Sequence, residues 1–382
     1  MARTSAEQFK ESLEKSKKIL ITTKANLAGD GLASCLALQI VLTKLNKHSD
    51  IIIDGFSLPK EFSFLPHGAD IKDAVSKLKK FTINLDIAQT GIEELSYDLN
   101  GNNLRIYLSP KKGVFTPDDL KFQTSEFAYD LIMTVAVNDL ESLGKLYDYH
   151  RDFFYQIPVI NIDNSPSNEQ FGHINLVDVT ATSAAEIIFN LISGWPEKVV
   201  DREVATCLLT GMIAGTKSFK TANVTPNSLT IASRLIDLGA NRQEIITHLY
   251  QTKTISTLKL WGRILSRLQS DSQSKLVWSK LNPHDFTESG ATAQDIPGVI
   301  DDLIAASPVA EIVLLFYQTE LGQTKVIARS LTAENILNLT RIFAPQGDKS
   351  QATFTVLQNL EDAATLVIET VTKQLRSFLL IN

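Results

Sequence analysis

The chain has 382 residues, of which 44% are hydrophobic and 21% are charged. This is the composition of an ordinary soluble protein, and the length allows two domains with their own cores. The net charge of −6 excludes a global positive field that would attract nucleic acid or an anionic membrane, so a polyanion site would have to be a local patch.

The sequence shows no targeting or membrane signal. No segment approaches the ~18 apolar residues of a membrane span, and the N-terminal stretch lacks the apolar core of a signal peptide. We therefore expect a cytoplasmic protein without membrane contact. Cys35 and Cys207 lie in apolar helical stretches, which predicts two buried, reduced thiols.

The first part of the chain alternates strands and helices. A short helix is expected over 5–17, a strand over 18–23, a helix that is apolar around most of its circumference over 32–45, and a strand over 51–53. Further strands are expected over 130–137, 158–163 and 174–178. This order predicts a parallel sheet with right-handed crossovers.

Residues 79–121 interrupt this pattern. Segments 81–87, 94–99 and 104–110 alternate apolar and polar residues, and the dipeptide Asn100-Gly101 lies between the last two. Because both residues tolerate positive φ, the dipeptide predicts a hairpin turn and the segment an antiparallel β insertion. The insertion either pairs with another subunit or is a plain surface extension.

The rest of the chain is helical and then mixed. Thr182 and Ser183 with Glu186 resemble a capping box at a helix start. Helices are expected near 183–193, 201–214, 226–238, 241–251, 256–268, 297–306, 333–343 and 357–378, and strands at 275–281, 311–317 and 324–330. We therefore predict three parts: 1–200, a helical part and connector over 201–270, and a smaller α+β module over 271–382 with a mixed or antiparallel sheet.

The segment VINIDNSPSNEQFG, residues 159–172, carries the most specific signal. It resembles the signature of the DHH phosphoesterases, in which Asp-His-His ends a strand and is followed by Pro and, two residues later, Asn. The resemblance extends over nearly the whole chain, to the DHH/DHHA1 family that includes RecJ-like exonucleases, nano-RNases and phosphoadenosine phosphatases. It implies an α/β fold with an N-terminal parallel-sheet DHH domain and a C-terminal DHHA1-like domain.

The resemblance also implies a site for two divalent cations, usually manganese, held by His and Asp at the carboxyl edge of the sheet. Asp30 and Asp163 keep the family's ligand type. The other motif positions depart from it: Lys24 stands at a His position, Ala28, Ala136 and Gly215 at Asp positions, and Asn164 and Ser165 at the two His positions of the signature. None of the six histidines occupies a motif position.

A buried carboxylate without a partner is costly. We therefore hypothesise that the Lys24 ammonium supplies the positive charge near Asp30 and Asp163 that metals supply in the family. The alternative is that Lys24 points to solvent.

In the family, a Gly-rich segment ending in His holds substrate phosphate; its counterpart here is FAPQGDKSQATF, with Asp348 at the His place. Residual binding of a nucleotide or short oligonucleotide is expected through Arg329, Ser330, Gly347, Lys349, Lys217 and Asn168.

Three hypotheses follow. The first is a pseudoenzyme that needs no cofactor and serves in binding or assembly. The second is an active oligoribonuclease or phosphoadenosine phosphatase with a reduced site, for example one Mn²⁺ or Mg²⁺ on Asp30 and Asp163. The third, compatible with the first, is a homo-oligomer subunit that uses the β insertion as its contact.

Overall fold

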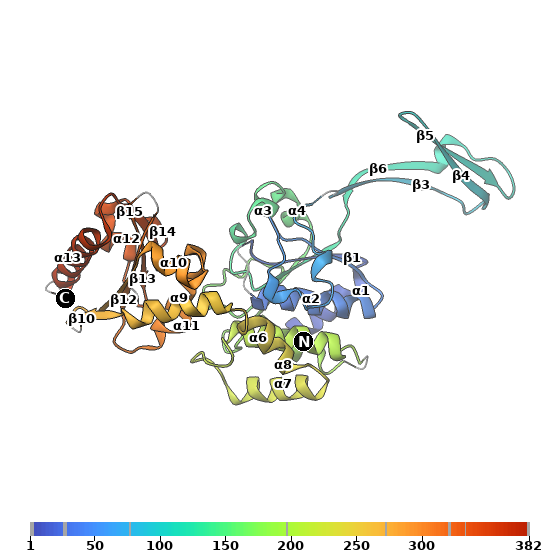
Figure 1. Cartoon of the computed structure of the whole chain (residues 1–382). Helices are drawn as coiled ribbons and strands as arrows, with labels where there is room; N and C mark the ends of the chain where they lie inside the picture. The colour runs from blue at the N-terminus through green and yellow to red at the C-terminus, as the bar shows by residue number, and fades with distance from the viewer. Residues whose placement is uncertain are drawn as a thin grey trace. The chain divides into compact units, whose positions relative to one another are not determined.

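The structure is a computed structural model that describes residues 4–25, 29–75, 78–195, 198–271, 273–319, 322–332 and 334–379. The chain divides into two compact units, Met1–Thr252 and Lys253–Asn382, whose elements are labelled in Figure 1. No helix in these ranges has the length and apolar character that a membrane crossing requires.

The first unit is built on a five-stranded sheet in the order β2-β1-β7-β8-β9, and all its neighbouring strands are parallel. Its strands are β1 (Lys18–Thr22), β2 (His48–Ile51), β7 (Leu131–Val135), β8 (Val159–Asp163) and β9 (Ile174–Val177). Every residue of β7 and β8 is buried, which explains their near-continuous apolar sequences. The predicted parallel sheet is confirmed.

Helices pack around this sheet. They are α1 (Ser5–Lys15), α2 (Gly29–Lys44), α3 (Lys145–Asp148), α4 (Arg151–Gln156), α5 (Ala184–Ile192), α6 (Arg202–Gly215), α7 (Pro226–Asp237) and α8 (Arg242–Tyr250), with short 3₁₀ turns at Lys60–Phe62, Gly68–Asp70 and Glu141–Leu143. Cys35 in α2 and Cys207 in α6 are free and buried, as predicted.

The helices α6 to α8 belong to the first unit and do not form a separate connector. Apolar side chains of all three, among them Leu208, Leu235 and Ile245, join the same core cluster as α2 and α5. The sequence prediction of a connector over 201–270 missed this packing, because an apolar helix face does not show which core it enters.

The β insertion is antiparallel, as predicted, and runs to Phe127. Its strands are β3 (Lys79–Leu85), β4 (Ile92–Asn100), β5 (Asn103–Pro110) and β6 (Leu120–Phe127), with a 3₁₀ turn at Pro117–Asp119. Strand β3 pairs with β6, and β4 pairs with β5. Asn100 pairs with Asn103, so the hairpin turn is one residue later than predicted, and Gly101 takes its positive φ of 59°.

The second unit contains a six-stranded mixed sheet in the order β10-β11-β12-β13-β15-β14, with β11 and β12 parallel. Its strands are β10 (Gln269–Asp271), β11 (Leu276–Leu281), β12 (Ile312–Gln318), β13 (Thr324–Ser330), β14 (Gln346–Gly347) and β15 (Gln351–Val356). Successive residues of β12 enter different clusters, because side chains of a strand alternate between faces: Leu314 joins one and Leu315 the other.

The helices of this unit are α9 (Ile255–Ser266), α10 (Pro283–Ser289), α11 (Pro297–Asp302), α12 (Ile336–Leu339) and α13 (Leu360–Leu379), with 3₁₀ turns at Ala293–Asp295, Ile304–Ala306 and Arg341–Phe343. The predicted helix over 333–343 is wrong beyond one turn, since the chain leaves helical geometry at Thr340. The predicted boundary near 270 also differs, because Leu260, Trp261 and Ile264 of α9 pack in this unit.

Candidate functional site

The motif positions meet at the carboxyl edge of the first unit's sheet. Strands β1, β7 and β8 are neighbours and parallel, so the residues that follow them, Lys24 and Ala136, lie at the same edge as Asp163, the last residue of β8. This edge is where open α/β sheets bind ligands. Asp30 reaches it from the first turn of α2, and Ala28 lies outside the described residues.

Asp30 is buried, with 7% of its surface exposed. Its Oδ2 accepts a hydrogen bond from the backbone N–H of Ala184 (2.7 Å), and its Oδ1 accepts from the N–H of Ala185 (3.2 Å) and from the Ser34 hydroxyl (3.1 Å). Ala184 and Ala185 are the first two residues of α5. The carboxylate therefore occupies the positive end of that helix.

Burial raises the pKa of Asp30 to about 6, although the N–H groups of Ala184 and Ala185 and the Ser34 hydroxyl lower it. The charge of Asp163 adds a smaller upward contribution. The two remaining carboxylates are thus close enough to repel each other.

Asp163 is also buried and satisfied locally. Its Oδ1 accepts from the N–H of Asn164 (2.9 Å), and its Oδ2 accepts from the Asn168 side-chain amide (2.8 Å). The same amide donates to the carbonyl of Val137 (2.8 Å), while its oxygen accepts from Asn161 (2.9 Å). Asn168, a predicted ligand-binding residue, is therefore a member of the network that holds Asp163.

The two signature positions that replace histidine make hydrogen bonds to other protein groups. The Asn164 amide donates to the carbonyl of Ala181 (3.2 Å), and the Ser165 and Ser167 hydroxyls lie 2.9 Å apart. Ala136 has a φ of 55°, a conformation unfavourable for alanine that is often found near functional sites.

The motif position at Gly215 lies close to Asp30 at the end of α6. A Cβ on Gly215 would lie 3.3 Å from the Cβ of Asp30. The loop beyond it is unusual, because Lys217, Ser218 and Phe219 have φ values of 47°, 61° and 61°. This loop leaves the Lys217 side chain exposed.

The hypothesis for Lys24 is not supported. Lys24 is half-buried, and within the described parts of the chain its ammonium forms no ion pair with Asp30 or Asp163. The two carboxylates are stabilised instead by the N-terminal amides of α5, by Ser34 and by the Asn168 amide.

The predicted binding residues of the second unit lie at one end of its sheet. The Arg329 guanidinium pairs with Asp301 (2.9 Å) and donates to Gln351, and the buried Ser330 hydroxyl donates to the carbonyl of Thr332 (3.2 Å). These contacts match the structural ion-pair role that an isolated strand arginine often has.

The counterpart of the Gly-rich segment is a tight turn. Gly347 has a φ of 143°, and a Cβ there would lie 2.1 Å from the carbonyl oxygen of Gln351. The Asp348 carboxylate accepts from the hydroxyl and the N–H of Ser350, both at 2.7 Å, and these bonds lower its pKa. Lys349 contributes its carbonyl to a bond from the N–H of Ile336 (2.9 Å).

Sequence reasoning missed the role of Glu186. The capping-box pattern marked it as a helix-start residue, but the residue is only 3% exposed, and its carboxylate accepts from Thr182 and from the amide of Asn227 (3.0 Å). It therefore ties the start of α5 to α7, and only the fold brings Asn227 to it.

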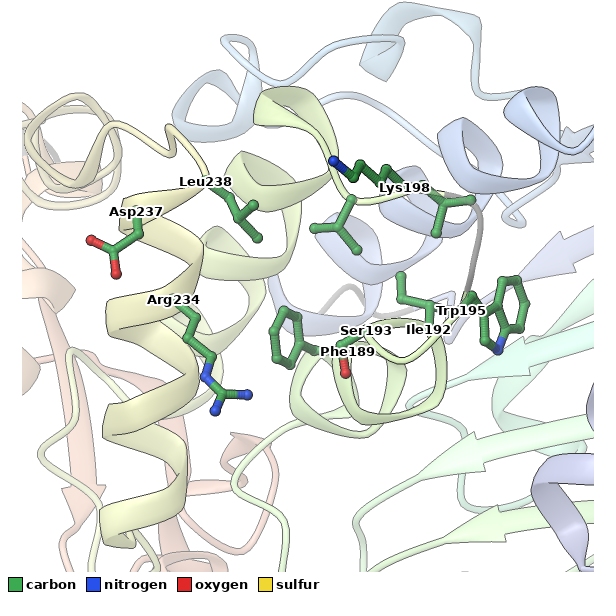
Figure 2. Close-up of a pocket in the computed structure, with 10 residues that line it drawn as sticks. Phe189, Ile192, Ser193, Trp195, Lys198, Arg234, Asp237 and Leu238 are labelled. Carbon is green, nitrogen blue, oxygen red and sulfur yellow. The ribbon is translucent and has the colours of Figure 1, made fainter.

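A separate cavity of about 520 Å³ lies at the other end of α5, and none of the motif residues line it. Figure 2 shows Phe189 and Ile192 of α5 facing Arg234 and Leu238 across this hollow. Among the described residues, no group of three or more His, Cys, Asp and Glu side chains has a metal-binding arrangement, at this cavity or elsewhere.

Comparisons with known proteins identify similar chains. The model of the DHH family, N-terminal domain, matches residues 18–212. A Thermus thermophilus protein named bifunctional oligoribonuclease and PAP phosphatase NrnA is 31% identical over 187 residues, which are 47% of this chain and 53% of that protein. The Bacillus subtilis protein of the same name is 26% identical over 178 residues, which are 45% of this chain and 54% of that protein.

The chain spans about half the length of these curated relatives. Among solved structures, an exopolyphosphatase-related protein from Bacteroides fragilis has a TM-score of 0.68 at 18% identity, covering 99% of this chain and 98% of that chain. At this identity the likeness concerns the fold.

Proposed function

The chain belongs to the DHH phosphoesterase family, and we propose that it is a member that has lost the two-metal site and acts by binding a nucleotide or short oligonucleotide or as an assembly subunit. One observation carries this proposal. The two carboxylates that remain at the motif edge accept hydrogen bonds from protein N–H and O–H groups.

The donor set does not fit a pair of divalent cations. Two such ions a few ångströms apart need several anionic or imidazole ligands. The described motif positions other than Asp30 and Asp163 offer an ammonium at Lys24, no ligand atom at Ala136 or Gly215, and an amide and a hydroxyl at the signature. Coordination by Asp30 would also compete with its bonds to the start of α5.

The alternative is an active phosphoesterase with one Mn²⁺ or Mg²⁺ on Asp30 and Asp163. It is favoured by the 31% identity to a protein named as an oligoribonuclease and PAP phosphatase, and by the repulsion between the two carboxylates, which a bound cation would relieve.

A turnover assay separates the two. The chain and its Asp163→Ala variant are incubated with short oligoribonucleotides and with PAP over a Mn²⁺ titration, and the Thermus thermophilus relative serves as the positive control. We expect no Mn²⁺-dependent release of mononucleotide or phosphate from either form. Release by the unchanged chain that is lost in Asp163→Ala would establish the alternative.

Ligand binding is tested separately by calorimetry with PAP and with di- and trinucleotides. Lys217 is the best-placed cation, because it is exposed on the loop that follows Gly215 beside Asp30. Lys217→Ala should weaken binding several-fold, whereas Lys220→Ala, another exposed lysine of the same loop, should not. If no binding is measurable at millimolar ligand, the ligand-binding part of the proposal is wrong and only the assembly role remains.

A further inference from the structure

Between Leu95 and Leu108, the β4–β5 hairpin has one face made of apolar side chains. In its register Leu95 is opposite Leu108, Tyr97 opposite Ile106 and Leu99 opposite Leu104. Because alternate residues of a strand point to opposite faces, these side chains share one face, which we call the apolar face: Leu95, Tyr97, Leu99, Leu104, Ile106 and Leu108.

The opposite face is mainly polar, with Tyr107 as its large aromatic side chain. It carries the pairs Ser96 with Tyr107 and Asp98 with Arg105. The hairpin is therefore amphipathic in the way expected of a sheet that packs one face against something.

The apolar face is nevertheless exposed. Leu99 is 69% exposed, Tyr97 67%, Leu95 61%, Leu104 57% and Ile106 46%. Figure 1 shows β4 and β5 at the far end of the ribbon formed by β3 and β6. A two-stranded hairpin is marginally stable in water unless its apolar face is packed, so this face needs a partner surface.

We propose that the partner is a second copy of this chain, and that two copies associate by packing their apolar faces together across a two-fold axis. The idea does not depend on what the carboxylate site binds. A face that meets its own copy must be self-complementary, and a sheet face that carries only apolar side chains meets that requirement.

The available area suits a dimer. Taking roughly 200 Å² for each large side chain, the exposed fractions amount to about 600 Å² on the apolar face. This area equals the upper end of the range for the largest exposed apolar patch on a typical monomer. Two such faces would together bury about 1,200 Å², which is the lower end of stable interfaces.

Charge also favours an identical partner. Residues 79–127 contain six basic and seven acidic side chains, and the apolar face itself contains none. Two copies of this segment therefore meet without the repulsion that the chain's overall charge of −6 would cause elsewhere. A polyanion would find no cationic surface here.

The test is the mass in solution at micromolar concentration, measured by sedimentation velocity and light scattering. The unchanged chain should have twice the monomer mass of 42.2 kDa. The variant Leu99→Glu with Leu104→Glu should be a monomer, and Ser96→Glu with Asn103→Glu, which changes the polar face of the same hairpin, should remain a dimer. A monomeric unchanged chain, or a dimer that survives Leu99→Glu with Leu104→Glu, would overturn the proposal.

Cross-linking supplies a second measurement that leaves the hairpin largely intact. Both native cysteines are buried, so an introduced surface cysteine is the accessible thiol. A short bismaleimide should produce covalent dimers of Tyr97→Cys but not of Ser96→Cys, because residues 96 and 97 lie on opposite faces. Equal cross-linking of the two variants, or cross-linking of Ser96→Cys alone, would exclude the face-to-face arrangement.

Discussion

Asp30 shows how a buried carboxylate can be kept at the motif edge by neutral donors. Its oxygens accept two N–H bonds from the start of α5 and one hydroxyl bond, yet burial still raises its pKa to about 6. The helix end and the hydroxyl thus offset only part of the desolvation cost. The group should therefore affect stability in a pH-dependent way.

The sign follows from the direction of the shift. Between pH ~4 and ~6 the folded chain keeps the proton on Asp30, whereas the unfolded chain has lost it, so this group's contribution to stability falls as the pH rises through that window. Raising the pKa of Asp30 from its usual value to about 6 corresponds to roughly 3 kcal/mol of unfolding free energy. Urea unfolding of the chain and of Asp30→Asn at pH 4 and pH 7 should show the unchanged chain losing about that much relative to the variant. An equal difference at both pH values would contradict the assignment.

The Asn168 amide should contribute more to the free energy of unfolding than its partial exposure suggests. Asn168→Ala removes the donor to the buried Asp163 carboxylate and to the carbonyl of Val137. Leaving such groups unpaired costs roughly 2–4 kcal/mol in unfolding free energy. Ser165→Ala, which removes a hydroxyl contact with Ser167 and the acceptor for the Ser167 N–H (3.3 Å), should cost only about 0.5–1 kcal/mol. Similar losses in the two variants would argue against the network.

At the scale of elements, the site depends on the close approach of α2, α5 and α6. Gly211 of α6 makes this possible, because a Cβ there would lie 2.9 Å from both the Ala185 Cβ and the Asp30 Oδ1. Those distances are shorter than ordinary van der Waals contact, so a larger residue requires the helices to shift.

Gly211→Ala should therefore destabilise the first unit by roughly 1–3 kcal/mol despite the better helix propensity of alanine. Gly262→Ala in α9 is the matched control, since nothing lies within 4 Å of a Cβ there. It should stabilise its own unit by about 0.5–1 kcal/mol. Thermal unfolding of both variants checks this. If Gly211→Ala leaves the stability unchanged, α2, α5 and α6 can move apart at little cost in free energy.

Local patterns predicted most elements because period-two and helical patterns are set by neighbouring residues. Two elements differ from their predicted positions. The hairpin turn moved by one residue because Asn100 pairs with Asn103. The helix expected over 333–343 is interrupted at Thr340, whose hydroxyl bonds to the carbonyl of Ile336 (2.7 Å).

At the scale of the whole molecule, the hydrophobic cluster in which a helix packs decides the unit to which that helix belongs. Leu260, Trp261 and Ile264 of α9 belong to the cluster formed by β11, β12 and α11. The second unit thus requires a helix that lies before the boundary expected from sequence.

A fragment of residues 253–382 should fold alone, whereas 271–382 should not, because removing α9 exposes Val277, Val313 and Leu315, which now lie in that cluster. Circular dichroism with thermal melting distinguishes them: the longer fragment should unfold cooperatively and the shorter one should not. Equal cooperativity would show that α9 is dispensable.

The sequence alone determined most of the order of strands and helices, the family resemblance and the motif positions at which ligand-type residues are replaced, because each can be read within a short segment. It missed the short elements α3, α4, α10, β10, β14 and β15. Tertiary structure decided what surrounds the two remaining carboxylates. Asp30 bonds to an amide 154 residues away, and Asn168 turns inward to Asp163. The first of these bonds depends on how distant segments pack, and no local pattern encodes it; the second joins two residues of one segment, but the local sequence does not show that the Asn168 side chain faces the carboxylate.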